Sequence, residues 1–373
     1  MEATLLDTNF NQVAVVSHFK SFIWNDRYVE PGDFELYIPM DPSLLQMYKK
    51  GYYLWNAESE HTMIIESISI EDSFDEGDFY VVSGRSLESI LGKRVVWNKK
   101  IFIRDENTGV KPNLQNGIKT LLEENAINPT MPARKIDNLI FKASTDEAVT
   151  KLTFEASYLG EDLLTVVKKL CQENDIGFKI TLNENDQFVF ELYAGVDRSY
   201  AQITRPYVTF SPRYNNITST KYKDSDKALK NVALVVGETE LDEDGNEITR
   251  IDYEFGSATG LDRREIFVDA TSLTLEDEDG GTRTAEQYQA LLRKRGIDAL
   301  MENTSATKFD GQLLPNIMYT YREDYNIGDV VQVEDAYGHE GTARITEYIM
   351  SHDNSGTAAY PTFEMIEKGV YEA

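Results

Sequence analysis

The most informative segment of this chain is Gly84-Arg85-Ser86-Leu87-Glu88-Ser89-Ile90-Leu91, which follows a strand-like run at 78–83. A second stretch, Asn326-Ile327-Gly328-Asp329-Val330-Val331-Gln332-Val333, opens a late region of strands. Neither stretch has the residue types or the spacing of a catalytic motif. Glycine in each has a physical reason, because it relieves the clash of a Cβ atom where a turn needs positive φ. Both stretches therefore predict turns between structural elements.

Strands dominate residues 1–104. The runs at 13–16, 34–38, 63–70 and 78–83 are rich in β-branched and aromatic residues, which favour strands. A hairpin turn predicted at 75–78 would place Ile68 and Ile70 opposite Tyr80 and Val82. We predict that residues 1–104 form a small antiparallel β-barrel domain.

The composition changes after Arg104, and residues 105–200 predict an α+β insert domain. Asn113 is a suitable N-cap for a helix with an apolar face. A second helix carries the apolar spacing i, i+3, i+4, i+7, i+8, and Gly177 follows it. Its stripe is Leu163, Val166, Val167, Leu170 and Cys171. Alternating residues at 178–182 and 188–192 then predict a half-buried hairpin.

Strands return from Tyr207 onward. Residues 201–310 predict a second barrel-like region, with an exposed hairpin tip at 242–246 and a helix. That helix begins with capping-box spacing between Thr284 and Gln287, and Gly296 is expected to be a weak point or a break. Residues 311–373 predict a C-terminal β-domain. The predicted fold class is mainly β with an α+β insert, in several domains.

Composition limits the function. The chain has 373 residues, and no apolar run approaches the roughly 20 residues that span a bilayer. The start lacks the features of a secretion signal, so we expect synthesis in a cytoplasm. The formal charge of −27 opposes stable nucleic-acid binding, because phosphates need compensating cations. It leaves DNA passage open, and solubility is the more ordinary reason for such a charge.

No residue pattern marks an enzyme, so we expect no catalytic, cofactor-binding or metal-binding residues. Cys171 is expected to be a buried structural thiol. The acidic run 276–281 fails the calcium-loop template, because Leu275 falls on its first position. The histidines lack metal-ligand spacing, although copies of one histidine could meet on the axis of a trimer. They are His18, His61, His339 and His352.

Aromatic and basic residues also have two interpretations. The tryptophans Trp24, Trp55 and Trp97 could line a carbohydrate site, but their place in strand-like segments favours a core or a subunit interface. The basic clusters Lys93-Arg94, Lys99-Lys100 and Arg293-Lys294-Arg295 are interpreted as solvated surfaces.

We call the segments 84–91 and 326–333 the two opening stretches. Together with Trp24 and Gly32-Asp33-Phe34-Glu35-Leu36, they resemble the tail hub proteins of long-tailed bacteriophages and prophages. In the resemblance, Gly84 to Leu87 is a strand-to-helix junction that leads to Leu91 and Arg94, and Gly328-Asp329 is the turn that starts the last barrel. The segments 231–237 and 261–269 are also similar to hub proteins.

The resemblance implies a non-enzymatic structural protein at the virion tail tip, assembled in the bacterial cytoplasm. It implies a homotrimeric ring that closes the tail tube at the baseplate and surrounds the tape-measure protein and, during ejection, the DNA. The implied partners are tail-tube, distal-tail and receptor-binding proteins. Many relatives continue into host-binding or wall-cleaving domains, whereas this sequence ends at Ala373, so separate proteins are expected to supply those activities. A carbohydrate-binding or glycan-cleaving tail protein is one alternative, and the spike hub of a cellular secretion machine is another.

Overall fold

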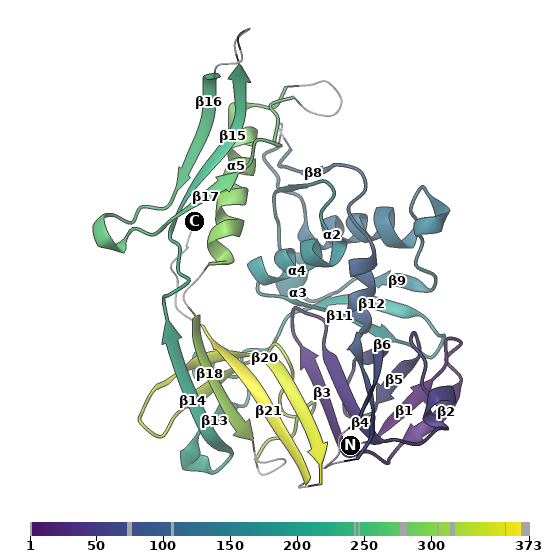
Figure 1. Cartoon of the computed structure of the whole chain (residues 1–373). Coiled ribbons are helices and arrows are strands. Elements are labelled where there is room, and N and C mark those ends of the chain that lie inside the picture. Colours follow the sequence, from purple (N-terminus) through teal and green to yellow (C-terminus); the bar gives the residue numbers. More distant parts are fainter. Residues whose placement is uncertain are drawn as a thin grey trace.

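The computed structural model describes residues 2–72, 77–105, 108–241, 244, 247–276, 282–303, 306–313, 318–354 and 356–366. A 13-stranded sheet forms the lower part of the molecule in Figure 1. Along its main path the strands are β14 (Ile217–Ser225), β18 (Ala306–Leu313), β21 (Gly356–Met365), β20 (Glu340–Asp353), β3 (Ser21–Arg27), β4 (Asp33–Pro39), β7 (Phe79–Ser86), β6 (Thr62–Glu71), β5 (Tyr53–Asn56), β1 (Ala3–Leu6) and β2 (Gln12–Val16). Beside this path, β19 (Val330–Glu334) pairs with β13 (Thr209–Phe210) and with β20.

The pairing of β3 with β20 joins the beginning of the chain to its end. The two strands are antiparallel, with Trp24 opposite Met350, and Tyr28 N donates to Thr346 O at 3.0 Å just beyond the ladder. Figure 1 shows the purple N-terminal strands beside the yellow C-terminal ones. One hydrophobic core contains side chains from both, including Trp24 and Phe363. The domain boundaries at residues 104, 200 and 310 stay predictions. The N-terminal strands and the C-terminal strands share one sheet and one hydrophobic core.

The register between β6 and β7 is confirmed, since Ile68 lies opposite Val82 and Ile70 opposite Tyr80. Residues 75 and 76 of the predicted turn lie outside the described residues. The reason predicted for Gly84 is wrong, because this glycine does not have positive φ. A Cβ atom at Gly84 would lie 1.8 Å from Ile64 O, beside a register irregularity in β6. Close approach of two backbones, not turn geometry, therefore requires glycine here.

The α+β insert lies above the large sheet in Figure 1, and its hydrophobic core also includes Ile64 and Leu87 from the N-terminal region. Asn113 caps its first helix, where the side chain accepts from Asn116 N at 3.1 Å. The predicted stripe with Cys171 is buried on the second long helix. The insert contains α2 (Leu114–Leu122), η2 (Glu123–Ile127), η3 (Pro132–Arg134), β9 (Leu139–Lys142), α3 (Glu147–Thr150), β10 (Ala156–Tyr158), α4 (Leu163–Glu173), β11 (Gly177–Leu182) and β12 (Phe188–Tyr193). The strand β8 (Lys100–Phe102) precedes the predicted boundary but pairs with β10. The predicted hairpin is confirmed as the antiparallel pair of β11 and β12.

A separate three-stranded sheet carries the longest helix. Its strands are β15 (Val232–Leu241), β16 (Glu247–Phe255) and β17 (Glu265–Asp269), and α5 (Ala285–Met301) packs against them. The capping box of Thr284 and Gln287 is confirmed. The expected break at Gly296 is wrong, because α5 continues through it with the glycine buried in the packing. Of the predicted tip at 242–246, only Asp244 is among the described residues.

Ion pairs line the contact between α5 and the insert. The Lys294 ammonium contacts both Glu173 at the end of α4 and Asp298 one turn along α5. Arg295 pairs with Glu161 and Lys169 with Glu302. The contact between α5 and the insert is therefore polar, as contacts between the domains of one chain commonly are. Across the described ranges, no helix combines the length and the apolar character needed to cross a membrane.

Candidate functional site

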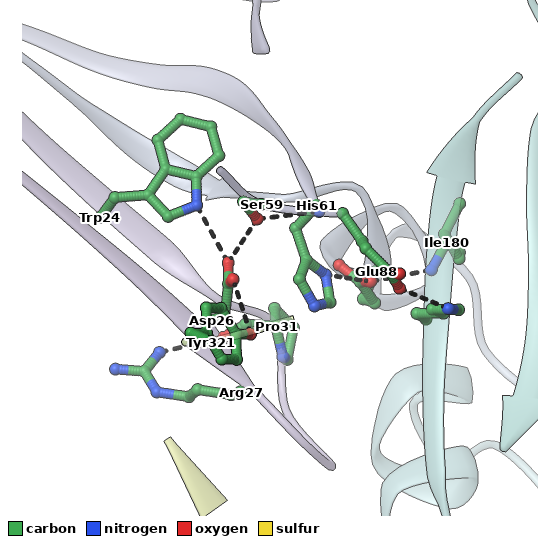
Figure 2. A network of polar contacts seen from close by, with 11 residues as sticks. Trp24, Asp26, Arg27, Pro31, Ser59, His61, Glu88, Ile180 and Tyr321 are labelled. Carbon is green, nitrogen blue, oxygen red and sulfur yellow. Dashed lines mark hydrogen bonds and ion pairs between the residues drawn. The ribbon is translucent and has the colours of Figure 1, made fainter. Parts of the chain in front are cut away.

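The first of the two opening stretches buries a charge. The 3₁₀ helix η1 (Leu87–Lys93) begins where β7 ends and places Glu88 in the interior with no exposed surface. One Glu88 oxygen lies 2.9 Å from Nδ1 of His61 and accepts from Ile180 N at 2.8 Å (Figure 2). His61 precedes β6 and Ile180 lies on β11. Glu88 therefore connects the N-terminal strands to the insert.

Asp26, on β3, continues the buried polar chain toward the C-terminal region. Its Oδ1 accepts from Trp24 Nε1 at 2.9 Å and from Ser59 Oγ at 2.7 Å, while Tyr321 OH donates to Oδ2 at 3.2 Å. Ser59 Oγ in turn accepts from His61 N at 3.0 Å. We call Asp26, Ser59, His61 and Glu88 the junction network. Figure 2 shows it running from β3 to β11.

Burial and charge oppose each other in the junction network. Burial disfavours the charged form of His61, but Glu88 and Asp26 outweigh it and raise the pKa of His61 to about 9. Burial likewise favours neutral Glu88, but the His61 charge and hydrogen bonds lower the Glu88 pKa overall. Burial raises the pKa of Asp26 despite its donors. At neutral pH the network therefore contains a buried imidazolium–carboxylate pair.

The second opening stretch forms a neighbouring contact. Asp329 is 2% exposed, and its carboxylate accepts from Val196 N at 2.7 Å, Asn326 N at 3.0 Å and Arg198 Nε at 2.8 Å. Gly328 has φ +90°, and a Cβ atom there would lie 2.2 Å from the Tyr28 ring. The prediction of positive φ is confirmed at Gly328, and Asp329 fixes the turn by accepting from Asn326 N.

Tyr28 ties the same turn to the rest of the molecule. Its hydroxyl donates to Asp175 O at 3.0 Å and accepts from Gly195 N at 3.1 Å. Tyr28 follows β3, Asp175 follows α4 and Gly195 follows β12. The two opening stretches thus meet at one three-way junction between the N-terminal strands, the insert and the C-terminal strands.

A cavity of about 190 Å³ lies at this junction. Polar and aromatic residues from all three regions line it, among them His61, Lys179 and Asp329. Lys179 Nζ contacts Glu60 at 2.5 Å, and Arg322 approaches the same carboxylate at 3.8 Å. The volume suits a small group of water molecules, which polar cavities hold with several hydrogen bonds each.

The arrangement of Ser59, His61 and Glu88 is not that of a catalytic triad. A triad needs the imidazole to take the serine proton, but Ser59 donates its proton to Asp26, and His61 faces Ser59 Oγ with its backbone N–H. Ser59 and His61 are each 4% exposed. The hydrogen bonds of the network connect β3, the start of β6, η1 and β11.

Other residues considered from sequence are not part of the junction network. Cys171 is buried, and burial raises the pKa of its thiol, as expected for a structural cysteine. His339 pairs with Asp335 at 2.7 Å, and His352 hydrogen-bonds Thr357 at 2.6 Å. In the part of the chain that the structure describes, no group of His, Cys, Asp and Glu side chains is arranged to hold a metal. Residues 277–281 of the acidic run lie outside the described residues.

Trp24 is fully buried, whereas Trp55 and Trp97 are 45% and 55% exposed. Trp24 is therefore a core residue, as the strand pattern favours. Sequence reasoning missed Asp26, Ser59 and Glu88. The available signal was at Glu88, a charged residue between Leu87 and the apolar pair Ile90-Leu91.

Comparison with known proteins agrees with this architecture. The family model for Siphovirus ReqiPepy6 Gp37-like protein matches residues 2–363. The 43 kDa tail protein of prophage MuSo2 from Shewanella oneidensis has a similar structure, with a TM-score of 0.60 at 13% identity, covering 97% of this chain and 98% of that one. A tail protein from Neisseria meningitidis MC58 gives 0.58 at 11% identity, over 99% and 97% of the two chains.

Prophage tail protein gp18 from Listeria monocytogenes EGD-e gives a TM-score of 0.51 at 11% identity, over 99% of this chain and 96% of that one. No curated protein matches the chain. The structural matches establish a shared fold, and the mainly β, multidomain prediction is confirmed.

Proposed function

Because the chain belongs to the Siphovirus ReqiPepy6 Gp37-like protein family, we propose that it is a structural protein of a phage or prophage tail. More specifically, we propose a hub that closes the tail tube at the baseplate. Its partners in this proposal are the tail tube, the distal tail protein, the tape-measure protein and receptor-binding proteins. Its place is the virion tail tip, after assembly in the host cytoplasm.

The pairing of β3 with β20 is the observation that carries the proposal. It places the N-terminal and C-terminal strands side by side in one chain. Glu88 holds the insert to the N-terminal strands, and Asp329 holds it to the C-terminal region. If each half offers one docking surface, three chains provide six around a central opening. That number matches a hexameric tube, so we propose a homotrimer. In this proposal the insert, residues 105–200, is a module that the ring carries.

Electron microscopy of tails that contain an N-terminally tagged chain tests the position and symmetry. We expect tag density at the tail tip, threefold class averages and a central opening. Density along the tube or on side fibres, or twofold symmetry, would contradict the hub.

We also propose that the chain has no hydrolase activity, because the buried Ser59 and His61 are not arranged for catalysis. Incubation with host cell wall should release no soluble fragments. Turnover that is lost when one carboxylate is replaced would favour the glycan-cleaving alternative.

A further inference from the structure

A basic and aromatic surface forms where η1 meets η3. Arg94 donates to the carbonyl oxygens of Lys93, Arg134 and Lys135. The Arg134 guanidinium lies 4.8 Å from the centre of the Trp97 ring, and its Nη2 donates to Val95 O at 2.7 Å. The sequence places these residues in separate segments, and the hydrogen bonds bring the backbones of Lys93 and Lys135 beside the Arg94 guanidinium group. We call Lys93, Arg94, Trp97, Arg134 and Lys135 the Trp97 patch.

The cations of the Trp97 patch are not neutralised. Among the residues that the structure describes, none of the four forms an ion pair with an acid, whereas nearby Lys100 pairs with Glu124 at 2.5 Å. Partial burial, and then the charge of Arg94, lower the pKa of Arg134. The chain has 64 acidic against 37 basic residues. A cluster of unpaired cations on such a chain is therefore unexpected for a surface that serves only solubility.

Apolar surface is exposed beside these cations. Trp97 is 55% exposed, Met131 49% and Val95 38%. Arginine and tryptophan together are typical of residues that contribute most to protein interfaces. Because Arg134 is already fixed over the indole ring, binding of a partner would cost little conformational entropy in the Arg134 side chain.

We propose that the Trp97 patch binds an acidic protein segment that carries an aromatic or apolar side chain. A short segment stays within a Debye length, about 8 Å at physiological salt, of the patch cations. A long polyanion extends over the rest of a surface whose chain carries −27 and is repelled there. The exposed apolar side chains also suit a peptide better than a phosphate polymer. The proposal does not depend on the trimer.

Fluorescence anisotropy with the full chain tests this binding. The probe is a short labelled peptide in which glutamates flank a phenylalanine, and a peptide with lysines in place of the glutamates is its control. We expect binding of the acidic peptide that weakens as salt rises. The double variant Lys93→Glu/Lys135→Glu should weaken it by about tenfold or more, and Trp97→Ala by about fivefold.

The charge-matched control is Lys221→Glu/Lys227→Glu, which changes two exposed lysines in and after β14. It should bind like the wild type. Equal binding by both double variants, or no binding of the acidic peptide to the wild type, would overturn the proposal. Tighter binding of inorganic polyphosphate, lost in the patch variant, would instead identify a general polyanion site and also overturn it. Thermal unfolding confirms that each variant is folded.

Discussion

Gly328 lies against the ring of Tyr28, and its substitution separates two effects at one residue. Gly328→Ala meets both a left-handed backbone at φ +90° and a ring atom 2.2 Å from the new Cβ. Gly338 has the same φ of +90° with no atom within 4 Å of a Cβ, so Gly338→Ala carries the backbone strain alone.

We expect Gly338→Ala to lower the free energy of unfolding by about 1 kcal/mol and Gly328→Ala by about 3 kcal/mol or more. Urea denaturation followed by circular dichroism measures both. Equal losses would mean that the Tyr28 ring moves aside at little cost.

His61 gives the junction network a pH dependence. Its pKa is about 9 in the folded protein against about 6.5 when unfolded, because Glu88 and Asp26 outweigh burial. Because its pKa is higher in the folded protein, His61 contributes stability that is complete below about pH 6.5 and is lost as pH rises through about 9. His61→Gln removes this contribution.

The free energy of unfolding of the wild type should therefore exceed that of His61→Gln by about 3 kcal/mol near pH 6, and the difference should shrink toward pH 10. Urea denaturation at stepped pH measures the two curves. Parallel curves over this range would show that folding does not raise the pKa of His61.

At the scale of elements, Lys294 holds α5 against α4. Its ammonium is the cation between Glu173 and Asp298, and burial, followed by Asp298, raises the pKa of Glu173 to about 8. Lys294→Leu leaves these two carboxyl groups facing each other. We expect a loss of about 2–4 kcal/mol and faster amide hydrogen exchange in α5 and at the end of α4.

Lys151→Leu is the matched control, because Lys151 also pairs with an acid at four residues' distance but is 73% exposed. It should change stability by less than about 0.5 kcal/mol and leave exchange in α5 unaltered. Unchanged exchange in the Lys294 variant would mean that apolar contacts alone hold α5 in place.

Elements were predictable where the signal is local. The cap at Asn113, the capping box at Thr284 and the stripe ending at Cys171 each depend on neighbours within a few residues, and each is confirmed. Gly296 was misjudged because helix propensity is a weak term, and packing of α5 on its sheet outweighs it. Gly84 was misjudged because the reason for glycine lies on another strand.

At the scale of the whole molecule, the junction could not be derived from the residues alone. Tyr321 and Asp26 are 295 positions apart, and Arg27 and Glu347 are 320 apart. No pattern within a segment specifies which distant partner a buried carboxylate meets. The resemblance supplied the order of the regions, while the structure revealed that both opening stretches contribute to one three-way junction.

Net charge sets how copies of the whole molecule associate. Each chain carries −27, so bringing three together is opposed by repulsion that acts over about 10 Å at 0.1 M salt and about 3 Å at 1 M. We therefore expect multi-angle light scattering to give a mass near that of one 42.5 kDa chain at low salt, rising toward a trimer at high salt. This salt dependence is opposite in sign to that of peptide binding at the Trp97 patch, so the two effects are separable in one salt series. A strict dimer at every salt concentration would rule out the threefold ring, because twofold contacts use the same surface on both partners and leave none for a third.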